Sequence, residues 1–73
     1  MFLAIDIGNS NVNCGIFYKG KWIKIISIPS SLNFLKEFIL LEKYKIINSA
    51  ISSVVPSLTD IYIQYVKNLF NSI

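Results

Sequence analysis

The chain begins with a short apolar run, Phe2 to Ile7, which is broken only by Asp6 and is followed directly by Gly8. A continuous apolar run of this length, closed by a glycine, is typical of a β-strand that is buried on both faces. Half-exposed strands alternate apolar with polar residues, and this run does not. We therefore expect this segment to form a strand at the centre of a sheet.

Two further strand-like segments follow, Val12 to Tyr18 and Lys21 to Ile28, and both are rich in isoleucine and aromatic residues. Lys19-Gly20 separates them and suits a tight hairpin turn. The sequence thus predicts three strands in a meander. The lysines of the third strand favour a position at an exposed edge of the sheet.

The remaining sequence adds two helical patterns around a fourth strand. Pro29-Ser30-Ser31 ends the sheet pattern and supplies capping residues for an amphipathic helix from Ser31 to about Tyr44. Ile46 to Val55 is predicted to be a strand parallel to the first and beside it, because a helix connects it to the sheet. Pro56-Ser57 begins a second helix. The expected fold class is α/β, in the order strand-strand-strand-helix-strand-helix, with an exposed apolar edge beside the fourth strand.

The length and composition limit the class of protein. A chain of 73 residues forms at most one small domain, which buries only about 60% of its unfolded surface. Yet 53% of the residues are apolar and the mean hydropathy is +0.56, so a further surface should cover part of the chain. No apolar run is long enough for a membrane span, and the first residues do not resemble a signal peptide. We therefore expect a cytoplasmic protein that does not bind membranes.

Charge and cysteine content argue against two other classes of site. Seven lysines without any arginine give a net charge of +3, which suits a solvated surface better than a nucleic-acid site. Cys14 is the only cysteine and there is no histidine, so we expect a buried thiol and neither a disulfide nor a cysteine-histidine pair. Trp22 and the tyrosines are interpreted as packing residues, because they fall on strand and helix stripes.

The turn after the first strand carries the candidate chemistry. Asp6 stands at the end of the strand, where open α/β sheets usually bind ligands, and its carboxylate can hold Mg²⁺. Gly8 allows a close backbone approach, and Asn9 tolerates the left-handed dihedrals that turn amide groups toward an anion. Neutral donors follow at Ser10, Asn11 and Asn13. The alternative is an ordinary turn, since these residue types are common in turns.

Two segments resemble a known family. Met1 to Phe17 reads MFLAIDIGNSNVNCGIF and resembles the amino-terminal phosphate-binding segment of the type III pantothenate kinases, whose usual motif is Asp-Ile-Gly-Asn-Thr-Asn. Ile51 to Thr59 reads ISSVVPSLT and is similar to the Ile-Ser-Ser-Val-Val-Pro segment of that family. Either segment alone would indicate only the wider superfamily of acetate and sugar kinases, Hsp70 chaperones and actin. Together, in this order and at this separation, they indicate the kinase family.

The resemblance implies an activity and a binding site. The family phosphorylates pantothenate with ATP at the start of coenzyme A synthesis, and its members are cytoplasmic homodimers that use Mg²⁺ and a monovalent cation, K⁺ or NH₄⁺. The residues that would form the ATP-phosphate loop are Asp6, Ile7, Gly8, Asn9, Ser10, Asn11, Val12 and Asn13. Asp6 would lie nearest the metal. Ser10 replaces the usual threonine and keeps its hydroxyl, whereas Val12 and Asn13 depart from the commoner order of residue types.

The resemblance also implies that much of a kinase is missing. The family fold has two ribonuclease-H-like, or actin-like, half-domains, and residues 1–73 would be the amino-terminal part of the first. The Gly-Ala-Asp-Arg segment with the catalytic base has no counterpart here, so no residue is assigned a catalytic role and the chain is expected to be inactive alone. Asp60 is attributed to a favourable position at a helix start. The alternative function is a noncatalytic interaction module, or a decayed half-domain, that docks on a separate second half.

One pair of serines leaves two interpretations open. Ser52 and Ser53 lie near the end of the predicted fourth strand, so one hydroxyl could face the same cleft as Asp6. Alternatively, both hydroxyls satisfy backbone groups at the turn from strand to helix. The second interpretation is the one we prefer from the sequence.

Overall fold

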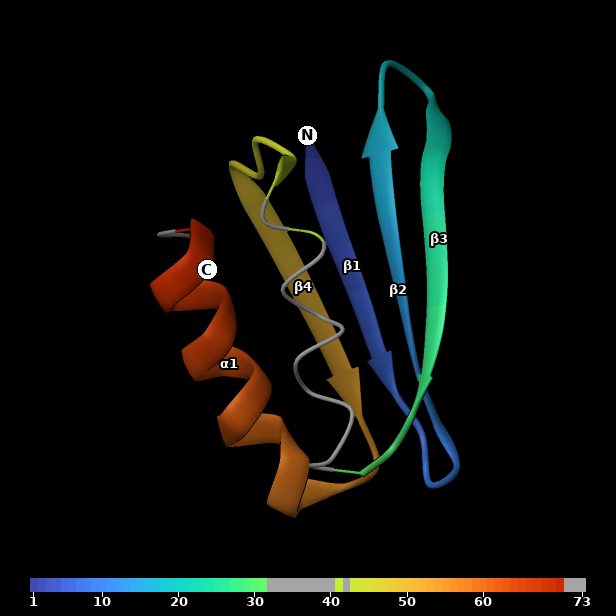
Figure 1. Cartoon of the computed structure of the whole chain (residues 1–73), viewed down its shortest axis with the longest axis vertical. Coiled ribbons are helices and arrows are strands. Elements are labelled where there is room, and N and C mark those ends of the chain that lie inside the picture. The colour runs from blue at the N-terminus through green and yellow to red at the C-terminus, as the bar shows by residue number, and fades with distance from the viewer. Residues whose placement is uncertain (32–40, 42, 71–73) are drawn as a thin grey trace.

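Four strands and one helix make up the described part of the chain (Figure 1). The computed structural model describes residues 1–31, 41 and 43–70. The elements are β1 (Phe2–Ile7), β2 (Asn11–Tyr18), β3 (Lys21–Pro29), β4 (Asn48–Ser53) and α1 (Pro56–Phe70). The helix that the sequence predicts from Ser31 to Tyr44 falls mainly on residues 32–40 and 42, which lie outside the described residues. Within the described ranges, no helix has the length and apolar character that crossing a membrane requires.

The strands form one mixed sheet in the order β3-β2-β1-β4. β1 pairs with β2 in the antiparallel sense and with β4 in the parallel sense. The predictions of a central first strand and of a parallel fourth strand beside it are therefore confirmed. The α/β class is confirmed too, and the arrangement is compatible with part of an actin-like half-domain.

The turn between β2 and β3 has the predicted hairpin geometry. Lys19 and Gly20 both have positive φ, at 50° and 83°. Two such residues in succession match the right-handed twist of the strands they connect, which is why the type I′ turn favours glycine. The Lys19 Nζ atom lies 5.2 Å from the centre of the Tyr18 ring, a cation–π contact that holds the lysine side chain against the strand end.

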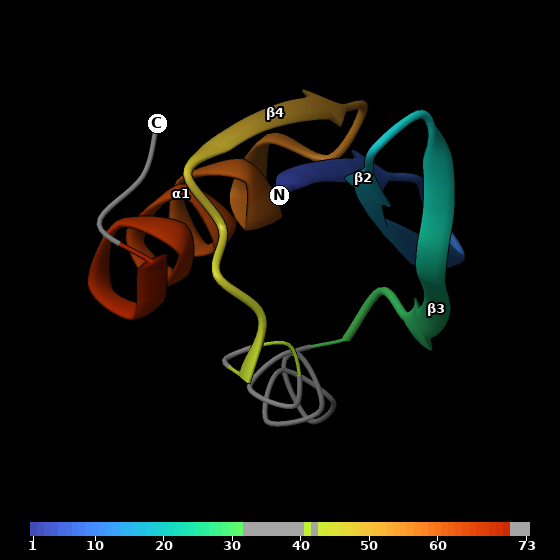
Figure 2. The same ribbon diagram turned by 90° about the horizontal axis from the view of Figure 1, so that it is seen from above.

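The core lies between one face of the sheet and α1, and Figure 2 shows the helix on one side of the strands. Alternate residues of β1 and β2 point into this core, as expected for strands with a period of two. α1 contributes residues spaced four apart, which places them on one helix face. The buried residues of these three elements are Leu3, Ile5, Ile7, Val12, Cys14, Ile16, Leu58, Tyr62 and Val66.

The opposite face of the sheet is open. Phe2 is 39% exposed and Asp6 is also exposed, so the expectation that the first strand is buried on both faces is wrong. The physical reason is that the core residues of the described chain all gather on the α1 side. We call the uncovered side the open face; its β1 and β2 positions are Phe2, Ala4 and Asp6 with their partners Phe17, Gly15 and Asn13.

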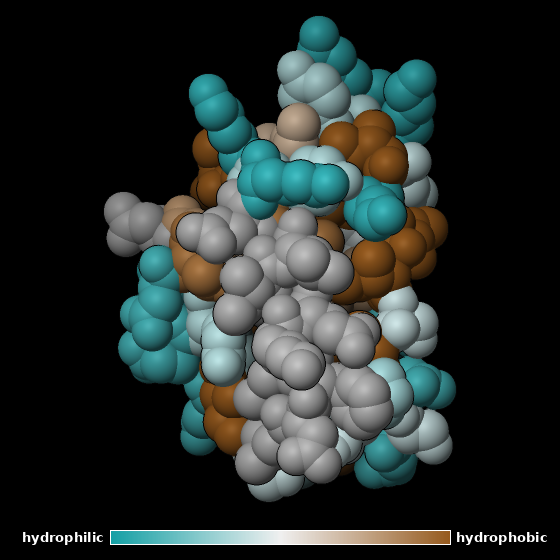
Figure 3. Space-filling model, in the orientation of Figure 1, coloured by the Kyte–Doolittle hydropathy of each residue, from teal (hydrophilic) through white to brown (hydrophobic). Residues whose placement is uncertain are grey.

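A β-bulge in β3 decides which side chains this strand adds to the open face. Ile16 pairs with Lys24 and Phe17 pairs with Trp22, so that Ile23 has no partner in the register. The additional residue reverses the alternation of β3, as bulges do, and it places Trp22 beside Phe17. Hydrophobic side chains consequently gather along the side of the molecule formed by β3 (Figure 3).

The thiol of Cys14 provides a test of this packing. Cys14 is 2% exposed, as the sequence predicts for a buried cysteine. Burial raises the pKa of its thiol from the ordinary 9.0 to about 12. Because the thiolate is the reactive form, Ellman's reagent near pH 8 should modify the folded chain about a thousandfold more slowly than the denatured chain.

The same shift has a pH dependence that can be measured. The folded pKa lies above the unfolded one, so the unfolded chain loses this proton first and the free energy of unfolding falls as the pH rises above 9.0. Denaturant unfolding at several alkaline pH values measures this slope, with Cys14→Ser as the control that removes the group. Rapid modification of the folded chain would contradict the described burial.

Candidate functional site

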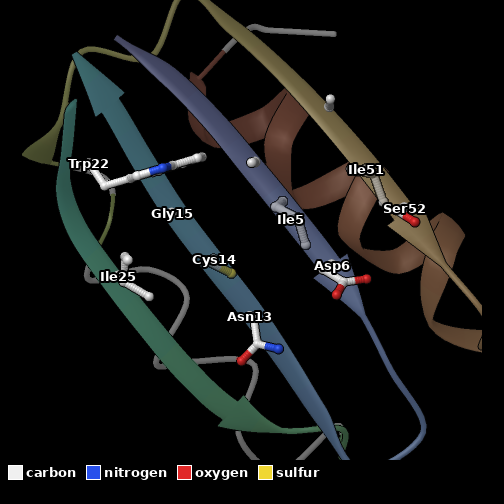
Figure 4. A pocket seen from close by; sticks show the side chains of 11 residues that line it. Ile5, Asp6, Asn13, Cys14, Gly15, Trp22, Ile25, Ile51 and Ser52 are labelled. Atoms are coloured by element: carbon white, nitrogen blue, oxygen red, sulfur yellow. The ribbon is translucent and has the colours of Figure 1, made fainter. Parts of the chain in front are cut away.

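A row of polar residues crosses the open face at one end of the sheet. Asp6 of β1 is the register partner of Asn13 in β2 and of Ser52 in β4. Asn13 is in turn the partner of Ser27 in β3. All four residues are exposed, and Figure 4 shows the Asp6 carboxylate between the Asn13 and Ser52 side chains. We call these four residues the polar row.

Beside the polar row lies a shallow cavity of about 400 Å³. Its floor has small side chains because the next cross-strand row consists of Gly15, Ala4 and Ala50. Trp22 and Ile25 of β3 bound it at one side. The cavity therefore joins an apolar floor to a carboxylate, an amide and a hydroxyl at one end.

Trp22 lies across β2 at the edge of this cavity (Figure 4). A Cβ atom added to Gly15 would be 2.7 Å from Cζ3 of the indole, so only glycine leaves room for the ring there. The Phe17 and Trp22 rings are 5.1 Å apart at 77°, an edge-to-face contact. Trp22 thus packs against its neighbours as predicted, although 52% of its surface is exposed.

The Gly8–Ser10 loop closes on itself. The Gly8 amide donates a 2.9 Å hydrogen bond to the Asn11 carbonyl. A Cβ at Gly8 would approach that oxygen to 3.1 Å, so the turn leaves little room for a side chain at this position. The close approach of this backbone to a ligand stays a prediction. The suggested left-handed backbone at Asn9 is wrong, because Lys19 and Gly20 alone have positive φ among the described residues.

The end of β3 also holds this loop. The Ser30 hydroxyl donates a 2.6 Å hydrogen bond to the Gly8 carbonyl, and the Ser30 amide donates one of 2.9 Å to the Ser10 carbonyl. The sequence places Ser30 among helix-capping residues and gives no sign of a contact with residues 22 positions earlier. No local pattern encodes such a contact, because it depends on how the ends of β1 and β3 meet.

Apart from Asp6 and Gly8, the predicted phosphate-loop residues divide into two groups. Asn9, Ser10, Asn11 and Asn13 are exposed and can offer amide or hydroxyl donors. Ile7 and Val12 have buried side chains in the core, so these two residues could contribute only their backbone. The exposed set lies at the same end of the sheet as Asp6.

The two serines of β4 have different roles. Ser52 lines the cavity next to Asp6. Ser53 faces the other side, where its hydroxyl accepts hydrogen bonds from the Val55 amide at 3.1 Å and from the Thr59 hydroxyl at 2.8 Å. Each sequence interpretation is therefore right for one residue, and the helix beginning at Pro56 starts from a turn that Ser53 stabilises.

The carboxylates of the described residues do not form a cluster of metal ligands. Within the described residues, no three residues of the types His, Cys, Asp and Glu gather in one place. Asp6 could therefore hold a metal only together with ligand atoms or water. Asp60 is exposed and lies in the second turn of α1, so its attribution to the helix start is wrong; the dipole acts mainly within the first turn.

Comparison with known proteins gives one consistent result. A sequence model of the family described as type III pantothenate kinase matches residues 2–73. Curated relatives with the same description occur in Malacoplasma penetrans (37% identical, over 94% of this chain and 30% of the relative), Ehrlichia canis (35%, over 97% and 31%) and Dictyoglomus turgidum (37%, over 96% and 32%). The chain spans about a third of the length of these relatives.

Gly15→Ala tests the contact between Trp22 and the cavity floor. The new methyl group would overlap the indole at 2.7 Å, so the ring must swing away from β2 into solvent. We expect a red-shifted emission and stronger acrylamide quenching of this single tryptophan, with little loss of secondary structure by circular dichroism. Ser27→Ala, on the same face but away from the ring, serves as the control; unchanged emission in Gly15→Ala would contradict the described position.

Proposed function

The chain belongs to the family of type III pantothenate kinases, and from this membership we propose that Asp6 to Asn13 form the first ATP-phosphate loop of a cytoplasmic kinase that phosphorylates pantothenate. Residues 1–73 would be the amino-terminal part of its first half-domain. The kinase as a whole, its substrates and its partners are proposals, because the chain spans about a third of the curated relatives.

The observation that carries the proposal is the arrangement at one end of the sheet. The Asp6 carboxylate, the Asn13 amide and the Ser52 hydroxyl stand side by side there. The Gly8–Ser10 loop lies at the same end, next to Asp6 in the chain. Carboxylates that hold Mg²⁺, together with backbone and neutral donors for phosphate oxygens, are the groups that bind a nucleotide without a P-loop lysine.

The residues present would supply part of a binding site for a magnesium-bound triphosphate. Asp6 would hold the metal, directly or through water, since Mg²⁺ is usually bound by one or two carboxylates together with phosphate oxygens. The turn contains no lysine that could offset the negative charge of the phosphates. Bound Mg²⁺ would offset that charge instead. Ser10 and Asn11 would donate hydrogen bonds to the phosphate oxygens. K⁺ or NH₄⁺ remains an implication of the resemblance, and no described residue is assigned to it.

We also propose that this chain alone does not turn over substrate. Phosphoryl transfer needs both reactants positioned and the transferred group stabilised, and the described residues offer one phosphate loop and one carboxylate for this purpose. The Gly-Ala-Asp-Arg segment expected to hold the catalytic base is absent from the sequence. No catalytic residue is therefore assigned here.

Asp6→Asn tests the proposed metal position. The substitution keeps the shape of the side chain and removes its charge, so binding of Mg²⁺-ATP should weaken by about ten- to a hundredfold, as expected for the loss of a charged contact. Isothermal titration with ATP, with and without Mg²⁺, measures the effect. Asp60→Asn is the matched control, since Asp60 lies exposed on α1.

Two outcomes would contradict this proposal in different ways. Equal Mg²⁺-ATP affinity in the wild type and Asp6→Asn would remove Asp6 from the site. Pantothenate-dependent ADP release by the purified chain would contradict the claim that it is inactive alone.

A specific observation favours a second candidate function, an interaction module that docks on a separate second half. The two rows of the open face beyond the polar row carry no charged residue; they consist of Ala4, Gly15, Ile25 and Ala50, and of Phe2, Phe17, Trp22 and Asn48. Trp22 and Ile25 are 52% and 67% exposed. Exposed apolar patches of this kind usually mark an interface.

We propose that the partner bound on the open face is the polypeptide that corresponds to the two-thirds of the relatives that this chain does not match. A second copy fits less well, because two small-residue floors facing each other would leave a cavity between them. Trp22 cannot fill that cavity, since its ring already lies against Gly15.

Co-expression tests this docking. The chain should co-elute with the remaining two-thirds of the Malacoplasma penetrans relative in size-exclusion chromatography, and Ala50→Arg should abolish the complex by placing a charge on the cavity floor. Asn68→Arg, on the exposed side of α1, is the control. A chain that sediments as a stable monomer at high concentration and does not bind that fragment would contradict the second candidate.

A further inference from the structure

The two peptide groups on either side of the Gly8 Cα atom are each held by one hydrogen bond. Gly8 donates through its amide to Asn11 and accepts through its carbonyl from the Ser30 hydroxyl. A peptide group is planar and trans, so its carbonyl and amide point in opposite directions. A Gly8 carbonyl fixed on Ser30 therefore directs the Asn9 amide away from Ser30.

The backbone around Ser30 supports the same contact. Pro29 ends β3 opposite Asn11 and has no amide hydrogen to donate. The next amide, that of Ser30, reaches past the end of the strand pair and donates to the Ser10 carbonyl at 2.9 Å. Ser30 thus contacts the loop at both ends, through its hydroxyl at Gly8 and through its amide at Ser10.

The loop has little else to define its shape. Asn9 and Ser10 are exposed, and neither amide has an acceptor within the described part of the chain. An exposed glycine-containing loop without fixed carbonyls would sample many orientations of these amides. The cost of ordering them would then reduce the affinity for an anion.

We propose that Ser30 is a positioning residue of the phosphate loop, and that its hydroxyl holds the Gly8–Asn9 peptide so that the Asn9 amide is directed toward a bound phosphate. This inference rests on the proposed function of the loop. Ser30 itself does not touch the ligand. Its effect is to reduce the entropy that the loop loses on binding.

Ser30→Ala removes the hydroxyl and leaves the backbone bond to Ser10 intact. We expect the affinity for Mg²⁺-tripolyphosphate, measured by isothermal titration, to fall about three- to tenfold, as expected for one hydrogen bond. Ser30→Thr keeps a hydroxyl at the same place and should restore the affinity. Amide hydrogen exchange should be faster at Gly8 in Ser30→Ala, because its bond to Asn11 belongs to the same loop.

Thr59→Ala is the matched control for a structural effect. It removes another partly buried hydroxyl bond, 2.8 Å long, between Thr59 and Ser53, and so should lower stability without weakening tripolyphosphate binding. Equal affinity in the wild type and Ser30→Ala would overturn the proposal, as would an equal loss in Thr59→Ala or no rescue by threonine. A wild type that does not bind tripolyphosphate would refute the proposed function and the positioning role with it, whereas the exchange rate at Gly8 would still show whether Ser30 holds the loop.

Discussion

The pairing of β1 with a neighbour on each side is the constraint on which the rest of the structure depends. The side chains of β1 alternate between the two faces of the sheet, which places Leu3, Ile5 and Ile7 in the core beneath α1 and leaves Ala4 and Asp6 on the open face. A shift of the strand by one residue would exchange the two sets and bury a carboxylate among apolar side chains. Folding and site formation are therefore decided by the same register.

Much of the architecture follows from local patterns in the sequence. The apolar runs, the Lys19-Gly20 turn and Pro56 at the start of α1 each act within a few residues, so each could be predicted without knowledge of the whole fold. The openness of the second face could not be predicted this way, because an apolar run says that a strand is suited to burial and not what covers it. The bulge at Ile23 is also a tertiary property, since it depends on how β3 aligns with β2.

The candidate site shows the same division. Asp6 and the turn after it stand out in the sequence because polar residues interrupt an apolar strand. The choice between Ser52 and Ser53 could not be made, because adjacent strand residues face opposite sides and only the parallel register assigns Ser52 to Asp6. The contact of Ser30 with the loop is not encoded locally either, because it depends on the meeting of two strand ends that are distant in the chain.

The bulge in β3 separates the strand into two parts with independent orientations. The part near the hairpin presents Trp22 to the open face, and the part near the loop presents Ser27 there and ends at Ser30. Because Ile23 is the residue without a partner, its deletion would leave Ile16 opposite Lys24 and Phe17 opposite Trp22, and would remove only the bulge. The bulge can thus absorb a change of one residue in length without changing which side chains β3 presents to the open face.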